Sequence, residues 1–198
     1  MVYILLGGLG FLIGYSLELL PVQKLPGAKP LLGTAAAGLL AFSLGMVSLH
    51  GGRLWLPAWL SALGGGLLSL ASLLLVYSLF LELPLRVTYI GTGPGPRLVT
   101  RGTYALVRHP TVLWYGLLLL STLLLTRSHL LLIGLPVWLA LDILWAVLQE
   151  RVSLPQTFPH YQHYQQVTPM LIPNLRSLRA CLVSLRSPKG SGAGLVGR

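Results

Sequence analysis

Acidic residues are scarce in this sequence, and cysteine is almost absent. The 198 residues include only four Asp and Glu, against 14 Lys and Arg, and a single cysteine, Cys181. One cysteine excludes an internal disulfide and a four-cysteine metal site. Because 9% of the residues are charged and 54% are hydrophobic, the chain has too little charge to cover the surface of a soluble domain of this length. The composition therefore predicts an integral membrane protein.

The hydrophobic residues form continuous stretches and do not alternate with polar ones. Continuous stretches of about 20 residues are typical of transmembrane helices, whereas alternation is typical of the strands of a membrane barrel. Five such stretches lie at about 2–20, 31–49, 54–83, 111–126 and 130–149. We therefore expect an all-α integral membrane protein with about five transmembrane helices, the first of which is kept as a helix and not cleaved as a signal peptide.

The third stretch, 54–83, is too long for one untilted crossing. It contains the glycines from Gly64 to Gly66, and it starts near Trp55 and Trp59. We expect a tilted or kinked helix there, or a start at the membrane interface beside the two tryptophans.

Lysine and arginine are divided unevenly between the loops that five spans would create. One side of the membrane receives only Arg53 and Arg127. The other side receives Lys24, Lys29, Arg86, Arg97, Arg101, Arg108, Arg151, Arg176, Arg179, Arg186, Lys189 and Arg198. Because cytoplasmic loops collect these residues, the N-terminus is predicted outside, with the loop 84–110 and the C-terminus in the cytoplasm. Basic residues in short loops, without interleaved aromatics, indicate no nucleic-acid partner.

The chain is predicted to form a single transmembrane domain over 1–173, followed by a basic C-terminal tail over 174–198. Over 175–186, leucines and arginines recur at roughly helical spacing, as in a helix that lies on a membrane surface. The last dozen residues are predicted to be disordered. The loop 84–110 carries the turn-rich run 91–96 before a polar segment, which makes it a candidate for an ordered site.

A first polar cluster extends from Arg101 to Pro110 and leads directly into the fourth predicted span. Pro110 suits the first position of a helix, so His109 would cap that helix beside its free backbone N–H groups. Such a helix end attracts anions. Together with Arg101 and Arg108, it is predicted to hold a carboxylate.

A second polar cluster begins at the end of the fifth predicted span, with Gln149 and Glu150, and continues through Tyr161 and Tyr164. A carboxylate at this position is suited to bind an ammonium group. The tyrosines are suited to pack against an adenine ring or to supply hydrogen bonds. The predicted topology places both clusters on the cytoplasmic face, where they can close over one pocket.

These two clusters resemble the isoprenylcysteine carboxyl methyltransferases and the related membrane phospholipid methyltransferases. The residues that carry the resemblance are Gly102, Tyr104, Arg108, His109 and Pro110 of a G-x-Y-x-x-x-R-H-P motif, and Glu150, Tyr161, Tyr164, Pro169, Ile172 and Pro173 of the later motifs. It covers about 86–173. The sequence departs from the family pattern after Pro110, where it has Val112 and Trp114, and in the acidic pair, where Gln149 replaces a glutamate.

The resemblance implies transfer of a methyl group from S-adenosylmethionine to a lipid-like or membrane-delivered acceptor, which is a carboxylate, an amine or a thiol. The implied catalytic residues are Arg108, His109 and Tyr104; the implied cofactor-binding residues are His109, Pro110, Glu150, Gln149, Tyr161 and Tyr164; the implied substrate-binding residues are Arg101 and Arg108. The cofactor would enter from the cytosol, and the acceptor would arrive from the lipid bilayer. His109 or Tyr104 would remove a proton from an amine or thiol acceptor.

Two other functions stay open at this point. One is a membrane reductase of the sterol-reductase type, which would use NADPH and has a similar Arg-His arrangement. The other is a non-catalytic membrane protein whose basic loop binds anionic lipid or a protein partner. Asp142, inside the fifth predicted span, is interpreted as a polar contact of the helix bundle. No metal site is expected, and the sequence identifies neither the methyl acceptor nor the oligomeric state.

Overall fold

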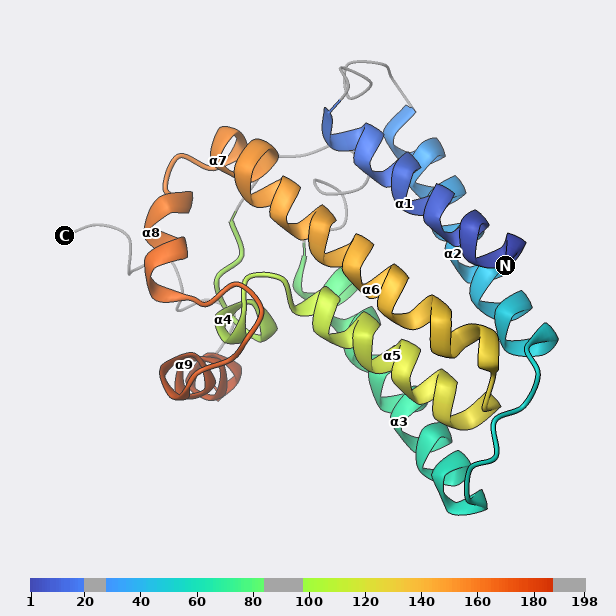
Figure 1. Cartoon of the computed structure of the whole chain (residues 1–198). Coiled ribbons are helices and arrows are strands. Elements are labelled where there is room, and N and C mark those ends of the chain that lie inside the picture. Colours follow the sequence, from blue (N-terminus) through green and yellow to red (C-terminus); the bar gives the residue numbers. More distant parts are fainter. Residues whose placement is uncertain (20–27, 84–97, 187–198) are drawn as a thin grey trace.

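The computed structural model describes residues 1–19, 28–83 and 98–186, and within these ranges it is built of helices without a named strand (Figure 1). The elements in chain order are α1 (Val2–Leu19), α2 (Ala28–His50), α3 (Ala58–Val76), η2 (Tyr77–Glu82), α4 (Thr103–Leu106), α5 (Pro110–Thr126), α6 (His129–Leu148), η4 (Gln149–Ser153), α7 (Leu154–Thr157), α8 (Tyr161–Val167) and α9 (Leu175–Arg186). The turns η2 and η4 are π-helical.

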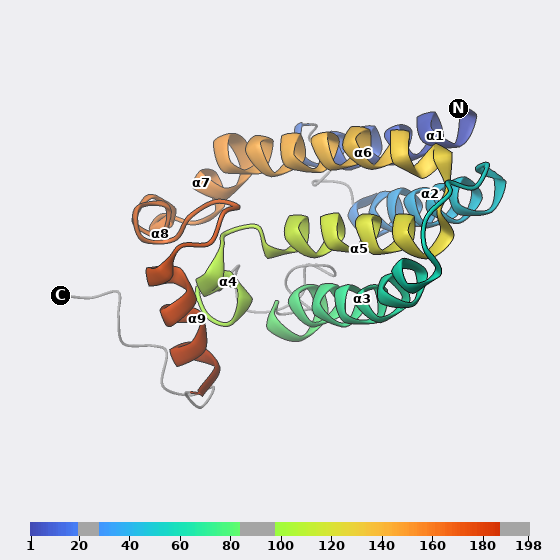
Figure 2. The same ribbon diagram turned by 60° about the horizontal axis from the view of Figure 1, so that its bottom comes forward.

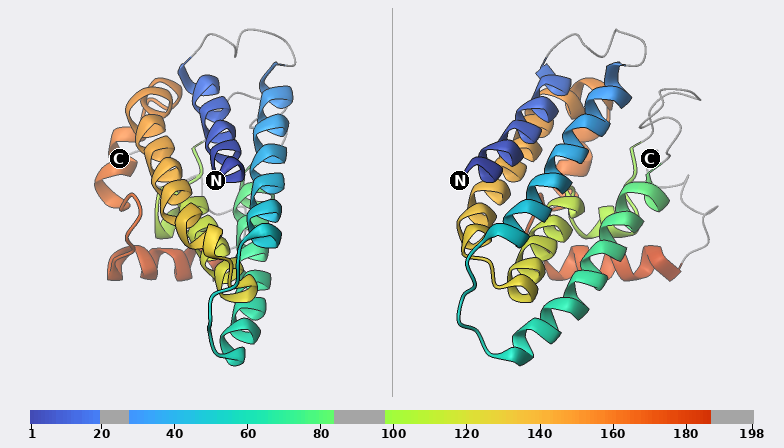
Figure 3. Two further views of the ribbon diagram at one scale, coloured as in Figure 1. Left: turned by 45° about the vertical axis from the view of Figure 1, so that its right-hand side comes forward. Right: turned by 90° about the vertical axis from the view of Figure 1, so that its right-hand side faces the viewer.

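The five long helices form one bundle. In it, α1 packs against α2 and α6, while α5 packs against α3 and α6 (Figures 1 and 3). Phe11, Val47, Leu119, Leu131 and Trp138 are buried between them. This core is narrow, because many large hydrophobic side chains point outward, as expected where a bundle meets lipid.

Three helical segments are long and apolar enough to cross a membrane, judged by length and composition. They are Pro30–His50, Ala58–Glu82 and His129–Thr157, and the shorter apolar helices are Val2–Leu17 and Pro110–Thr126. Each of the five predicted stretches is therefore helical, and the expected all-α fold of a membrane-protein type is confirmed at this level. The count of five spans and the orientation stay predictions.

The glycines of the third stretch do not break its helix. The helix α3 continues from Ala58 to Val76 and passes through all three of them. At Gly64 an added Cβ would lie 2.6 Å from the backbone nitrogen of Leu125 and 2.9 Å from the carbonyl oxygen of Ser121. Gly64 therefore allows α3 to approach α5 closely. The helix begins at Ala58, between Trp55 and Trp59, and the tilt, kink or interfacial start expected for this stretch stays a prediction.

One end of the bundle collects the polar elements. Here α3 continues into η2, α6 continues into η4, and α5 begins, while α4, α8 and α9 lie alongside (Figure 2). The two π-helical turns carry Glu82 and Glu150, two of the four acidic residues of the chain. Single π-helical turns often mark functional sites.

The predicted surface helix of the tail is present as α9, which runs across the direction of the bundle helices (Figures 2 and 3). Leu175, Leu178 and Val183 are exposed on it, whereas Ser177 and Cys181 are buried. The predictions for Lys24, for the run 91–96 and for the last dozen residues lie outside the described residues.

Candidate functional site

The N-terminus of α5 has the predicted local structure. His109 is the N-cap residue of α5, with φ −121° and ψ 68°, and the buried Pro110 follows in the first turn. The His109 side chain makes no cap hydrogen bond and is directed to Glu150 instead. The backbone N–H of His109 donates to the carbonyl oxygen of Met170 at 3.2 Å.

Glu150 is the centre of a buried hydrogen-bond cluster that joins the two predicted motifs. Its Oε1 accepts from Arg108 Nε at 2.8 Å, from His109 Nε2 at 2.9 Å and from the Tyr161 hydroxyl at 2.6 Å. Its Oε2 accepts from Gln165 Nε2 at 2.7 Å. Because a carboxylate accepts without donating, His109 Nε2 must carry a proton. We call these five residues the Glu150 cluster.

Arg108 also binds the end of α8 and the segment that follows it. Its Nη1 donates to the carbonyl oxygens of Gln165 at 2.8 Å and of Thr168 at 2.9 Å, and its backbone N–H donates to Pro169 at 2.9 Å. One guanidinium group therefore connects the end of α6, the end of α8 and the start of α5. Charge-assisted hydrogen bonds of this kind are stronger than neutral ones.

Three atoms of the cluster keep unused hydrogen-bonding capacity. Within residues 1–19, 28–83 and 98–186, Nη2 of Arg108 and Nδ1 of His109 have no hydrogen-bond partner. Glu150 Oε2 accepts one hydrogen bond, against three at Oε1. The cluster can therefore still donate to an anion through Arg108 and accept one more donor at Glu150.

The two predicted aromatic residues of the second motif are both buried. The exposed fractions of Tyr161 and Tyr164 are 1% and 4%, and their ring centroids are 5.9 Å apart with an interplanar angle of 67°. Burial, with the hydrogen bond to Glu150, raises the pKa of the Tyr161 hydroxyl, and burial likewise raises the pKa of Tyr164. Both groups therefore remain neutral donors near pH 7, and the Tyr164 hydroxyl donates to the Tyr104 carbonyl oxygen.

The other predicted site residues lie near the Glu150 cluster in the structure. The Tyr104 hydroxyl donates to the Ser78 carbonyl oxygen at 3.4 Å. Arg101 donates to the Ser184 carbonyl oxygen of α9 at 3.5 Å, so its guanidinium faces the tail helix. Gln149 is half-buried in η4. Pro110 is buried at the start of α5 and fixes the direction of that helix.

A second acidic anchor, Glu82, was not anticipated from the sequence. It accepts hydrogen bonds from the backbone N–H of Thr103, at 2.8 Å, and from the Thr103 hydroxyl, and so caps α4. Gly102 makes room for it: φ is 62°, and an added Cβ would lie 1.6 Å from Glu82 Oε1. The position of Glu82 could have indicated its role, because this acidic residue stands at the end of the third hydrophobic stretch, as Glu150 stands at the end of the fifth. Gln165 was also missed, although it follows Tyr161 by one helical turn.

The departure from the family pattern at Trp114 has a structural role. Trp114 Nε1 donates to the hydroxyl oxygen of Ser78 at 2.9 Å, and the Ser78 hydroxyl also contacts Thr103 Oγ1 at 3.0 Å. Val112 is buried in the first turn of α5. Through Ser78, Trp114 therefore links α5 to η2 and α4. Asp142 lies close enough to Tyr15 and Tyr115 to interact electrostatically with them, as a contact between helices would.

The tail helix α9 belongs to the same end of the molecule. The backbone N–H of Gly102 donates to Ser184 Oγ at 2.8 Å, and α9 packs against α4. Asn174 caps this helix by accepting from the Ser177 backbone N–H at 2.8 Å. In the part of the chain that the structure describes, no three His, Cys, Asp or Glu side chains gather as a metal site would require.

Comparison with known proteins identifies no relative of this chain. No protein-family model matches this chain, and neither a curated protein nor a solved structure matches it.

Proposed function

We propose that this protein transfers a methyl group from S-adenosylmethionine to a lipid-like or membrane-delivered acceptor. One observation carries the proposal: Arg108 and Glu150, which come from the two separate motifs, are hydrogen-bonded at one end of the bundle. The resemblance of both motifs to membrane methyltransferases supports it, because that resemblance requires them to form a single site.

The unused atoms of the Glu150 cluster fit the amino-acid end of the cofactor. Arg108 Nη2 would donate to its carboxylate, and Glu150 Oε2 would accept from its ammonium group. When bound, the cofactor supplies a methyl group that its sulfonium already activates. The task of these side chains is then to hold one end of the donor in a fixed orientation and to exclude water from it.

Tyr161 and Gln165 would act as positioning residues in this proposal. Each donates to Glu150, and both are held by α8, so they fix the carboxylate without touching the acceptor. The adenine ring is not placed by these contacts, since both tyrosine rings are buried.

His109 is suited to accept a proton from an amine or thiol acceptor. Its Nε2 proton is held by Glu150, so Nδ1 is the atom with a free lone pair. A carboxylate acceptor needs no such step, and Arg101 or Arg108 would orient it instead.

The proposed site lies in the cytoplasm on a chain of about five spans with its N-terminus outside. Among the described residues, Arg101, Arg108, Arg151 and the arginines of α9 lie at this end of the bundle, and their number supports that orientation. The acceptor would enter sideways from the bilayer, which the lipophilic surface of the helices around the cluster favours.

A binding titration of S-adenosylmethionine to the purified protein in detergent tests the proposal. We expect one cofactor per chain, with affinity lowered at least about tenfold by Arg108→Ala and by Glu150→Gln, as loss of a charge-assisted hydrogen bond implies. Arg151→Ala is the matched control, because Arg151 is exposed beside Glu150 without an ion pair in the described residues. Absence of cofactor binding would exclude methyl transfer, and binding of NADPH in its place would establish the sterol-reductase type.

A second candidate is a non-catalytic membrane protein that binds anionic lipid or a partner. The specific observation in its favour is the number of bonds that the Glu150 cluster makes to the protein itself, which a structural anchor would also make. The exposed arginines of α9 are suited to anionic headgroups. This candidate predicts lipid binding that depends on charge, together with no affinity for either cofactor.

A further inference from the structure

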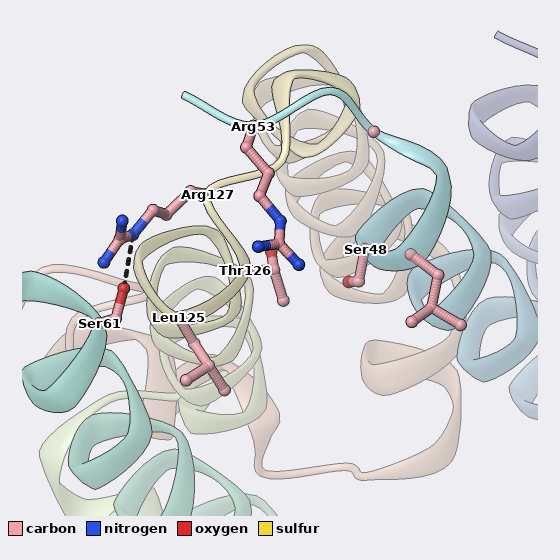
Figure 4. A pocket seen from close by; sticks show the side chains of 8 residues that line it. Ser48, Arg53, Ser61, Leu125, Thr126 and Arg127 are labelled. Carbon is pink, nitrogen blue, oxygen red and sulfur yellow. Dashed lines mark hydrogen bonds between the residues drawn. The ribbon is translucent and has the colours of Figure 1, made fainter. Parts of the chain in front are cut away.

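The end of the bundle opposite the Glu150 cluster contains a cavity of about 380 Å³ (Figure 4). It lies where α2 ends, α3 begins and α5 ends. Its lining consists of Ser48, Leu49, Gly51, Arg53, Ser61, Leu125, Thr126 and Arg127.

The walls of this cavity are fixed by hydrogen bonds between two connecting segments. The Leu54 backbone N–H donates to the Arg127 carbonyl oxygen at 2.6 Å, and the His129 N–H donates to Gly52 at 2.8 Å. Ser128 Oγ donates to the Val47 carbonyl oxygen at 2.7 Å, and an added Cβ at Gly51 would lie 1.9 Å from that Oγ. The cavity is therefore formed by ordered backbone that has little freedom to collapse.

Two arginines face this cavity without a carboxylate. Among the acidic residues whose side chains the structure describes, Glu82, Asp142 and Glu150, none lines it. In the described ranges, the Arg53 guanidinium has neither a hydrogen bond nor an ion pair, and it reaches toward Thr126 (Figure 4). Arg127 Nε donates to Ser61 Oγ at 2.7 Å, which leaves its two terminal nitrogens for another acceptor. The cavity therefore has a positive charge that no group of the described protein neutralises.

Among the described residues, the Ser61 hydroxyl accepts from Arg127, and no lining hydroxyl accepts from Arg53. Ser48 donates to the Leu44 carbonyl oxygen, and Thr126 donates to that of Thr122. With these hydrogens committed, the donors that remain are the guanidinium groups, whose planar forks match the oxygens of a phosphate. A phosphate oxyanion is the ligand that this chemistry favours.

The surroundings of the cavity point to a lipid as the source of that phosphate. Trp55 and Trp59 stand two positions in the sequence from the lining residues Arg53 and Ser61, and they are exposed to 95% and 65%. Exposed tryptophans of this kind mark the depth of the lipid headgroups. Leu49 and Leu125, in the lining itself, are exposed to 79% and 40%. A bound headgroup phosphate would therefore have apolar surface beneath it for the acyl chains.

We propose that Arg53 and Arg127 bind the phosphate of an anionic phospholipid in this cavity, a lipid site separate from the Glu150 cluster. A headgroup without its own cation is favoured, because the cavity offers no carboxylate to pair with an ammonium group. The site does not depend on the proposed methyl transfer.

Native mass spectrometry of the detergent-solubilised protein, titrated with phosphatidylglycerol or phosphatidylcholine, tests this lipid site. We expect a first phosphatidylglycerol to bind at least about tenfold more tightly than phosphatidylcholine. Arg53→Gln should reduce that preference several-fold, and Arg53→Lys should restore part of it. The Arg53 side chain is exposed and makes no hydrogen bond or ion pair with the described residues, while its bridge to Ser128 is made by the backbone, so we expect the replacement to leave the fold intact.

The control variant Arg176→Gln removes the same charge from α9. Equal losses in Arg53→Gln and Arg176→Gln would overturn the proposal, because they would show attraction by net charge alone. Equal binding of the two lipids by the unmodified protein would also overturn it. A third arm adds inorganic phosphate: if millimolar phosphate displaces the first phosphatidylglycerol completely, the site takes the free anion and the lipid assignment is wrong.

Discussion

Arg108 Nε and Glu150 Oε1 lie 2.8 Å apart, although 42 positions separate the two residues in the sequence. Arg108 stands just before α5, and Glu150 stands in the π-helical turn after α6, so the pair closes the loop that these two antiparallel helices make. The side chains of both residues are nearly buried, with exposed fractions of 11% and 8%. The stability and the proposed chemistry of this end of the molecule therefore depend on the same contact.

Replacing Glu150 with glutamine should destabilise the protein strongly. The change removes the negative charge that Arg108 and His109 face, and removing one partner from a buried ion pair costs about 3 kcal/mol. The free energy of unfolding in detergent measures this cost. The double variant Arg108→Gln/Glu150→Gln should lose less than the sum of the single losses, and strictly additive losses would contradict a direct pair.

Replacing Tyr161 with phenylalanine should cost about 1.5 kcal/mol, because it deletes one hydrogen bond to a charged group and keeps the ring packing. If Tyr161 positions Glu150, this variant should also weaken S-adenosylmethionine binding. The control is Tyr3→Phe at the opposite end, where the tyrosine ring packs against His50. Loss of stability with unchanged cofactor affinity would reduce Tyr161 to a structural residue.

Replacing Gly102 with alanine should be among the most damaging single changes. The new Cβ would occupy the position of Glu82 Oε1 and would also impose a side chain on a backbone with φ of 62°. We expect the free energy of unfolding to fall by at least about 2 kcal/mol, because the backbone strain at residue 102 and the loss of the cap of α4 both contribute. The matched control is Gly66→Ala in α3, where no atom lies within 4 Å of the new Cβ and the helix gains up to about 1 kcal/mol. Equal effects of the two changes would contradict the packing described at Gly102.

The buried tyrosines Tyr161 and Tyr164 should ionise at a higher pH than exposed tyrosines do. Because burial raises the pKa of both Tyr161 and Tyr164 above the ordinary 10.0, the folded state holds these protons more tightly than the unfolded state. Their contribution to stability is therefore complete below pH 10 and is lost as the pH rises through the folded-state pKa. A titration of phenolate absorbance should show that Tyr161→Phe/Tyr164→Phe removes only late-titrating groups, and loss of early-titrating groups would refute this.

The sequence predicts the helices well because their signal is local. A continuous apolar stretch gives both the helix and its approximate ends, so the stretch 111–126 corresponds to α5 at Pro110–Thr126. The motif Arg108-His109-Pro110 also gives its own local structure, since proline fixes the first turn of a helix. The prediction that both clusters lie at one end followed from the number of helices between them.

The missing details depend on contacts between distant segments. Glu82 was overlooked because Thr103, which donates to it through its backbone N–H and its hydroxyl, lies 21 positions further along the chain. No pattern in either segment relates the two residues. The direction of Arg101 depends on where α9 lies, which no pattern in the loop 84–110 specifies. The close contact of Gly64 with α5 was not anticipated, because sequence alone does not distinguish a flexible glycine from one that a neighbouring helix contacts.

Labelled methyl transfer in lipid bilayers is the most direct test of the central claim. The purified protein, reconstituted with total lipid extract and S-adenosylmethionine carrying a labelled methyl group, should place the label in a lipophilic product. Arg108→Ala should reduce this transfer at least about a hundredfold, as loss of a residue that orients the donor implies, while Arg151→Ala leaves it unchanged. Label that stays entirely in the aqueous phase, or equal transfer by the protein and Arg108→Ala, would contradict the account.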